Sequence, residues 1–101
     1  MKKTRRRYVR FRLFQEGKRV NEKQLVTAIR KSMLSLFGEI VVGDSKLFLT
    51  DYDTKSGVGI LQCSAHILER ALAAASVIGT IAGTKVSFHP MKTSGTIKGL
   101  G

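Results

Sequence analysis

Residues 7–14 read RYVRFRLF, and the apolar and polar side chains of this stretch alternate one by one. A period of two with aromatic and β-branched residues predicts a β-strand. The strand would carry on its buried face Val9, Phe11 and Leu13, and on its other face Tyr8, Arg10 and Arg12. The stretch therefore predicts a sheet with a core on one side and positive charge on the other.

An amphipathic helix is expected after this strand. Gly17-Lys18 makes a turn, and Asn21 has the features of an N-cap because Gln24, three residues later, completes a capping box. The spacing predicts a helix over 22–37 that Gly38 ends. Its apolar stripe would consist of Leu25, Ala28, Ile29, Met33, Leu36 and Phe37.

Three more strands and a second helix are expected in the rest of the chain. Two β-rich runs, 46–52 and 58–63, are joined by the turn formers of residues 53–57, which favours a hairpin. Ser64 can cap a helix over 65–78, which Gly79 would end. A last strand over 85–89 would stop at Pro90.

The predicted order is β-α-β-β-α-β, which is typical of the α+β class. It corresponds to a ferredoxin-like or RNA-recognition-motif-like sandwich, in which a four-stranded antiparallel sheet has both helices on one face. The 101 residues would form a single domain. Residues 1–6 would be a basic lead-in, and 91–101 a tail rich in Gly, Ser and Thr.

Positive charge dominates the composition. The chain has 18 Lys and Arg residues against seven Asp and Glu, which gives a formal net charge of +11. So much positive charge on a small domain repels itself, and the simplest explanation for keeping it is a polyanionic partner. Nucleic acid is favoured over an anionic membrane, because the chain has neither a basic amphipathic helix nor a lipidation motif.

The cations gather at both ends of the chain. Residues 1–12 carry no acidic residue, and the candidate RNA-binding cations there are Lys2, Lys3, Arg5, Arg6, Arg7, Arg10 and Arg12. Tyr8 lies among them as the one aromatic residue that could stack on a base. A solvated tail is the alternative interpretation of residues 2–6, since basic tails often become ordered only on their target.

The sheet face without helices can be tested for a base-stacking platform. Residues 57–59 have the Gly-x-Gly spacing of an RNA-recognition motif, but Val58 and Ile60 stand where that motif has aromatic residues. Aliphatic side chains stack poorly on bases, so this stacking mode is not expected. Val58 and Ile60 would instead form an exposed apolar patch for a protein partner, unless the C-terminal tail folds back over them.

The second helix offers a further candidate protein contact. Ala73, Ala74 and Val77 lie off its expected core stripe. They would extend the protein interface, although alanine is also simply a good helix former.

No catalytic or metal-binding set is evident. The loop over 15–19 resembles that of an acylphosphatase-like hydrolase in having a glycine and Arg19, but Glu16 would repel the phosphate. Asp51 and Asp53 flank a turn and are interpreted as turn formers. His66 and His89 have no partner at ligand spacing, and Cys63 has no local base. Catalysis by the chain alone, a metal site and a protein-bound cofactor are therefore not expected.

The single cysteine excludes a disulfide framework and a cysteine-based zinc site. The basic start runs directly into the first strand without an apolar segment of the kind found in secretory signals. Both features predict a cytoplasmic protein.

Several motifs resemble the family of archaeal ribonuclease P protein component 2. The resemblance covers nearly the whole chain and rests on Arg7-Tyr8, on Leu36-Phe37-Gly38, and on residues 47–53 followed by the strand Gly59-Ile60-Leu61-Gln62-Cys63-Ser64. The tail Ser94-Gly95-Thr96-Ile97-Lys98 completes it.

The resemblance implies a subunit of the ribonucleoprotein that cleaves the 5′ leader of precursor tRNA. In that enzyme the RNA carries the catalytic site and its Mg²⁺ ions, so the protein would touch precursor tRNA only indirectly. The resemblance also implies a protein partner, ribonuclease P protein component 3, and self-association through this subunit. The protein pair would stabilise the catalytic domain of the RNA.

The tail is a second candidate phosphate site. Its residues Ser94, Gly95 and Thr96 would offer successive backbone N–H groups and two hydroxyls, close to Lys92 and Lys98. A helix N-cap at Thr96 that serves packing alone is the alternative. Two other functions stay open: a free-standing RNA-binding module, ribosomal or tRNA-binding, and a small hydrolase.

Overall fold

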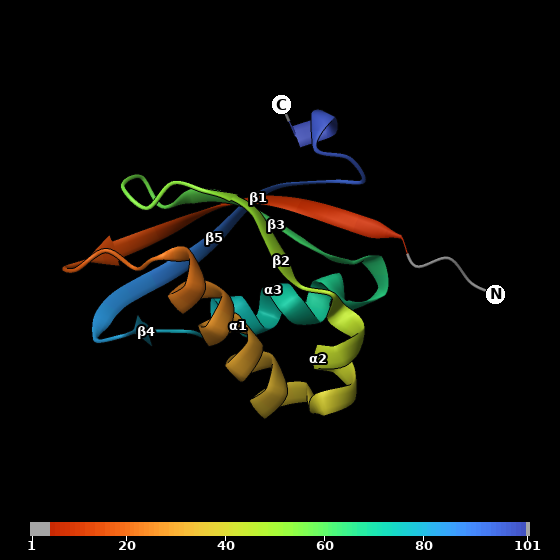
Figure 1. The fold of residues 1–101 in the computed structure, drawn as a ribbon, viewed down its shortest axis with the longest axis horizontal. Helices are drawn as coiled ribbons and strands as arrows, with labels where there is room; N and C mark the ends of the chain where they lie inside the picture. Colours follow the sequence, from red (N-terminus) through yellow and green to blue (C-terminus); the bar gives the residue numbers. More distant parts are fainter. Residues whose placement is uncertain (1–4, 101) are drawn as a thin grey trace.

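The computed structural model describes residues 5–100. It contains one antiparallel sheet whose five strands lie in the order β2-β3-β1-β5-β4, with the three α-helices on one face (Figure 1). The elements in chain order are β1 (Arg6–Glu16), α1 (Glu22–Phe37), α2 (Glu39–Ser45), β2 (Phe48–Tyr52), β3 (Val58–Ser64), η1 (Ala65–Ile67), α3 (Leu68–Ser76), β4 (Thr80–Ile81), β5 (Thr84–Ser94) and η2 (Lys98–Leu100). The α+β class and the antiparallel sheet are confirmed.

The sheet has five strands rather than the expected four. The additional strand, β4, forms a hairpin with β5 through Ala82 and Gly83, whose φ angles are 50° and 81°. Two successive positive φ angles are typical of the type I′ turn, which suits the twist of a two-residue hairpin. Alanine is an uncommon residue at the first of these positions, so the sequence does not signal the turn.

Strand β5 extends past Pro90, which was expected to end it. Phe11 of β1 pairs with Pro90 and Arg10 pairs with Lys92, so Met91 is an extra residue in a β-bulge. Beyond Lys85 the other side of β5 pairs with no strand of the described chain, because β4 reaches only residues 84–85. A proline, which lacks an N–H donor, is tolerated on such an open edge.

Helix α1 begins and ends where the sequence predicts. The side chain of Asn21 accepts from the Gln24 N–H at 2.8 Å, and the Gln24 side chain accepts from the Asn21 N–H at 3.0 Å. Val20, which precedes the N-cap, and Leu25 are both 1% exposed, as expected for a hydrophobic staple. The helix therefore starts with its orientation toward the sheet already fixed.

The core lies between the sheet and the helices. Phe11 stacks with Phe88 of β5 at a ring-centroid distance of 4.8 Å and with Tyr52 of β2 at 6.2 Å. Helix α1 buries Leu25, Ile29 and Met33 against this sheet face. The buried face predicted for the first strand, Val9, Phe11 and Leu13, is confirmed.

The second half of the helical layer differs from the prediction. The expected helix 65–78 is divided into η1 and α3, and α3 ends at Ser76. Ser64 is at the N-cap position of η1, but its side chain makes no capping hydrogen bond there, and its hydroxyl donates to the carbonyl of Asp44 at 2.8 Å. Helix α2 was not predicted and packs against α1 and β3. None of the helices in the described part of the chain has the length and apolar content to cross a bilayer.

Candidate nucleic-acid interface

The register of β1 and β5 brings together residues that are far apart in the sequence. Tyr8 pairs with Ser94, Arg10 with Lys92 and Arg12 with His89. These residues alternate with the buried face of β1, so they lie on the sheet face opposite α1 and α3 (Figure 1). We call Tyr8, Arg10, Arg12, Lys92 and Ser94 the basic sheet face.

Positions on the basic sheet face are held by hydrogen bonds on both sides of β1. The strand pairs with β3 from Arg6 to Arg12 and with β5 from Tyr8 to Glu16. Opposite residues of paired strands have Cβ atoms about 5 Å apart. Arg10 and Lys92 therefore present two cations at one level of a rigid surface, which is what closely spaced phosphates require.

Arg5, Arg6 and Arg7 lead into this surface. The Arg5 carbonyl accepts from the Ala65 N–H at 2.8 Å, which ties the lead-in to the end of β3. Arg5 and Arg6 are exposed, and Arg7 is half-buried. The Arg7 guanidinium lies against Gly95, since a Cβ atom on Gly95 would be 2.6 Å from Arg7 Nη1. Lys2 and Lys3, also predicted to bind RNA, lie outside the described residues.

The tail is folded, which changes the expected phosphate site. The Thr96 N–H donates to the Ser94 hydroxyl oxygen at 3.2 Å, and the Gly99 N–H donates to the Thr96 hydroxyl oxygen at 3.1 Å. Thr96 thus accepts an N–H of the first turn of η2 from just outside it, which is close to the capping role that the sequence left open. The expectation that the Thr96 N–H is free for phosphate is wrong for the chain alone, whereas Lys98 is exposed.

The tail also covers part of the sheet. Helix η2 contacts β1 and β5 on the face opposite the three α-helices (Figure 1), and Leu100 is 3% exposed. Ile60 is 9% exposed and Val58 is half-buried, although no α-helix lies on that face. The expectation that Ile60 forms an exposed patch is therefore wrong, since Ile60 is buried on the side of the sheet where η2 packs against β1 and β5.

The contacts expected on the second helix are only partly exposed. Ala74 is 0% exposed and belongs to the core, so its expected position off the core stripe is wrong. Its carbonyl also accepts from the Ser32 hydroxyl of α1 at 2.7 Å, because the two helices pack closely there. Ala73 is exposed, and Val77, just after α3, is 66% exposed.

A different apolar surface is present at the junction of α1 and α2. We call it the apolar ridge, and its exposed residues are Leu34 (46%), Leu36 (51%), Phe37 (37%) and Ile40 (80%). Leu36 and Phe37 were expected in the core stripe, but α1 already fills the core with Leu25, Ile29 and Met33. The signal in the sequence is the excess of apolar residues over 33–37, more than one helix stripe can bury.

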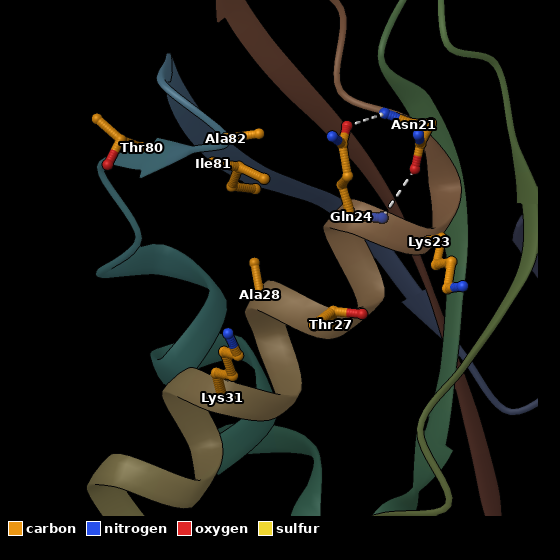
Figure 2. A pocket seen from close by; sticks show the side chains of 9 residues that line it. All are labelled: Asn21, Lys23, Gln24, Thr27, Ala28, Lys31, Thr80, Ile81 and Ala82. Carbon is orange, nitrogen blue, oxygen red and sulfur yellow. Dashed lines mark hydrogen bonds between the residues drawn. The ribbon is translucent and has the colours of Figure 1, made fainter.

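A shallow hollow of about 480 Å³ lies between the first half of α1 and β4. Figure 2 shows Ala28 of α1 facing Ile81 and Ala82, while the side chains of Asn21 and Gln24 are engaged in the capping box. None of its nine lining residues is a histidine, cysteine or carboxylate. Its ionisable lining residues are Lys23 and Lys31.

The remaining reactive groups have structural roles. Burial raises the pKa of the Cys63 thiol to about 11, so at neutral pH the thiol is protonated and a poor nucleophile. The Ser56 hydroxyl and the Lys55 N–H donate to Asp53 at 3.0 Å and lower the pKa of its carboxyl group, which supports its interpretation as a turn former. Within residues 5–100, no three His, Cys, Asp or Glu side chains could hold a metal ion together.

Comparison with known proteins gives the family. A family model described as the Rpp14/Pop5 family matches residues 7–100. The chain is 34% identical over 96 residues to ribonuclease P protein component 2 of Archaeoglobus fulgidus, covering 95% of this chain and 84% of that protein. It is 31% identical over 99 residues to the protein of that name from Methanothermobacter thermautotrophicus, covering 92% and 79%.

A solved structure has a similar fold. A chain in the cryo-EM structure of yeast ribonuclease MRP superposes with a TM-score of 0.67 at 5% sequence identity, covering 95% of this chain and 78% of that chain. At this identity the likeness concerns the fold alone. On the strength of the family model and of relatives above 30% identity over most of its length, the chain belongs to the Rpp14/Pop5 family, which confirms the resemblance seen in its motifs.

Proposed function

We propose that the chain is a protein subunit of ribonuclease P, which binds and stabilises the catalytic domain of the RNA that cleaves the 5′ leader of precursor tRNA. The assignment to ribonuclease P is supported by the names of its curated relatives, which are all called ribonuclease P protein component 2. The observation that carries the RNA-binding part is the alignment of Arg10, Arg12 and Lys92 across β1 and β5, on the face opposite the α-helices.

The contribution of the protein would be electrostatic. An RNA folded tightly enough to hold catalytic Mg²⁺ brings phosphates close together, and fixed cations relieve their repulsion. Arg10 and Arg12 are placed by a strand that is paired on both edges, so binding does not have to order their backbone. Their planar guanidinium groups suit bidentate phosphate contacts. Bond cleavage is assigned to the RNA and its Mg²⁺ ions, and precursor tRNA is contacted indirectly.

The proposed protein partner is ribonuclease P protein component 3, in the cytoplasm, and the apolar ridge is the surface that we assign to it. The ridge lies on the helical side of the sheet, so a protein bound there leaves the basic sheet face free for RNA (Figure 1). Four exposed large apolar side chains in one short segment are typical of a protein interface. Self-association of the subunit is the alternative use of this ridge.

The salt dependence of RNA binding tests the proposal. The variant R10A/R12A/K92A should bind a ribonuclease P RNA transcript with a slope of log K against log salt that is shallower by about 0.7–0.9 per lost phosphate contact. The matched control, K23A/K31A/R70A, removes the same charge from the helical side and should keep the wild-type slope. Equal slopes in the two triple variants would reject the basic sheet face as the RNA site.

Direct measurements distinguish the ribonuclease P subunit from the two other hypotheses, a free-standing RNA-binding module and a small hydrolase. A free-standing RNA-binding module would bring many RNAs out of a cell extract, whereas a subunit brings down one RNA and a fixed set of proteins. A small hydrolase would turn over phosphate esters or acyl phosphates as a pure chain. In the loop over 15–19, which was compared with that of an acylphosphatase-like hydrolase, the side chain of Gln15 already has a structural hydrogen bond. Its Oε1 accepts from the Val20 N–H at 2.6 Å.

A further inference from the structure

Phe14 is a large aromatic residue that the core does not use. It follows Arg10 and Arg12 at two-residue spacing on β1, on the same sheet face, and 45% of it is exposed. It lies opposite Ser87 of β5, at the end of the sheet away from Tyr8. The Gly-x-Gly pattern discussed above lies on β3, so it says nothing about this position on β1.

The Phe14 ring is held by its neighbours. The Arg12 guanidinium carbon lies 4.7 Å from the ring centroid, which is a cation–π contact. The His89 ring meets Phe14 edge to face, with centroids 4.9 Å apart and an interplanar angle of 80°. His89 is itself fixed, because its Nε2 lies 2.8 Å from the Ser87 hydroxyl oxygen. We call Arg12, Phe14, Ser87 and His89 the Phe14 platform.

A hollow adjoins the platform. It has a volume of about 490 Å³, and its lining includes Phe14, Glu16, Lys85 and Ser87. By register, Glu16 pairs with Lys85 two residues beyond the Phe14–Ser87 pair, so the hollow continues along the strands on the side away from Arg12. This volume lies within the range of about 300–1,000 Å³ that is typical of small-ligand sites.

The chemistry around Phe14 favours a nucleotide over a protein side chain. A protein-docking patch needs contiguous apolar residues, but the immediate neighbours of Phe14 on this face are Arg12, Glu16, Ser87 and His89. A flat base uses the π-face of Phe14, and its phosphates use cations placed on either side, Arg12 and Lys85. Ser87 and Glu16 supply a hydroxyl and a carboxylate at the edge where a base presents its hydrogen-bonding groups.

We propose that the Phe14 platform binds one unpaired RNA nucleotide, with its base stacked on Phe14 and its flanking phosphates beside Arg12 and Lys85. The proposal rests on the proposed RNA-binding function and adds to it a preference for a single-stranded or bulged position. A duplex keeps its bases stacked on one another, so it cannot use the platform.

A tryptophan reporter provides the test, because the chain has no tryptophan of its own. In full-length F14W, an eight-nucleotide single-stranded RNA should quench the indole fluorescence through stacking, and a duplex of the same sequence should not. F14A should bind the single-stranded probe about tenfold more weakly than the wild type, with unchanged affinity for the duplex. The control is F48A, since Phe48 is 58% exposed but lines a hollow beside α1.

The outcomes separate this inference from the function on which it rests. Wild-type affinity of F14A for both probes, with no quenching in F14W, would overturn the platform and leave RNA binding by the basic sheet face standing. A wild-type chain that binds neither probe nor ribonuclease P RNA would overturn both. If F14A weakens only the binding of a protein partner, the platform is a protein contact and the nucleotide proposal is wrong.

Discussion

Gly59 of β3 lies directly opposite Phe11 of β1, and a Cβ atom on Gly59 would stand 2.8 Å from the Phe11 ring. It would also stand 2.7 Å from the Asp51 carbonyl oxygen, part of the paired backbone of β2. Neither neighbour can move easily, since Phe11 is fully buried and stacked on Phe88. The glycine is therefore required by packing.

Gly59→Ala should lower the free energy of unfolding by about 1–3 kcal/mol, the usual cost of overpacking a core. Urea unfolding measures the loss. Gly79→Ala is the control, because nothing lies within 4 Å of a Cβ atom there, and it should change stability by less than about 0.5 kcal/mol. Equal stability of the two variants would show that the sheet shifts to accept the methyl group.

Leu100→Asp should release the tail from the sheet. A buried leucine contributes about 1.5–3 kcal/mol, so the variant should lose up to that amount, and the Leu100 N–H, bonded to the Ile97 carbonyl at 3.0 Å, should exchange faster with solvent. Ile97→Asp, at a position 45% exposed, should have little effect. Unchanged exchange in Leu100→Asp would contradict the packing of η2 on β1 and β5.

Cys63 should make stability depend on pH above 9. Burial raises the pKa of its thiol from 9.0 to about 11, so between these values the unfolded chain binds fewer protons than the folded chain. Stability is thus fully present below pH 9 and falls as the pH rises toward 11, by up to about 1.4 kcal/mol per pH unit. Cys63→Ala should show a flatter decline in urea unfolding between pH 9 and 11.

Tyr52 acts in the same direction at higher pH, because burial raises the pKa of its phenol. Both the wild type and Cys63→Ala retain this contribution, so their difference isolates the thiol. Parallel declines in the two proteins would mean that the Cys63 thiol ionises as readily in the folded chain as in the unfolded one.

If component 3 binds the apolar ridge as proposed, replacing Phe37 and Ile40 with Asp should weaken that complex at least tenfold, as loss of apolar anchors does at interfaces. The fold should persist, since Phe37 is 37% and Ile40 80% exposed. Size-exclusion chromatography with light scattering measures the complex and also detects dimers of the chain alone. Val58→Asp is the comparison. A larger loss of affinity in this variant would show that the partner binds the sheet face and not the apolar ridge.

The elements set by local patterns were predictable. Alternation over 7–14 predicts β1 and its two faces, and the capping box at Asn21 and Gln24 predicts the start of α1. Elements that depend on tertiary context were not. Strand β4 needs a type I′ turn with Ala82 at positive φ, and the full length of β5 needs a bulge at Met91 that lets Pro90 face an open edge.

The candidate site was predicted as two separate segments. Arg10 and Arg12 could be placed on one face from the sequence, but their pairing with Lys92 and His89 depends on the bulged register of β5. The spacing of Gly57 and Gly59 resembled an RNA-binding motif, whereas the structure assigns Gly59 to the close approach of Phe11. The ridge at Phe37 and Ile40 was missed because α2 was not predicted.

The central place of β1, between β3 and β5, has a consequence for heating. Strands paired along both edges are usually the last to open, while termini and short peripheral helices fray first. Arg10 and Arg12 would then keep their mutual geometry in partly melted forms of the chain that have already lost η2 and α2. Affinity for nucleic acid should accordingly survive warming until the whole sheet dissolves cooperatively, well after the C-terminal turn has come loose.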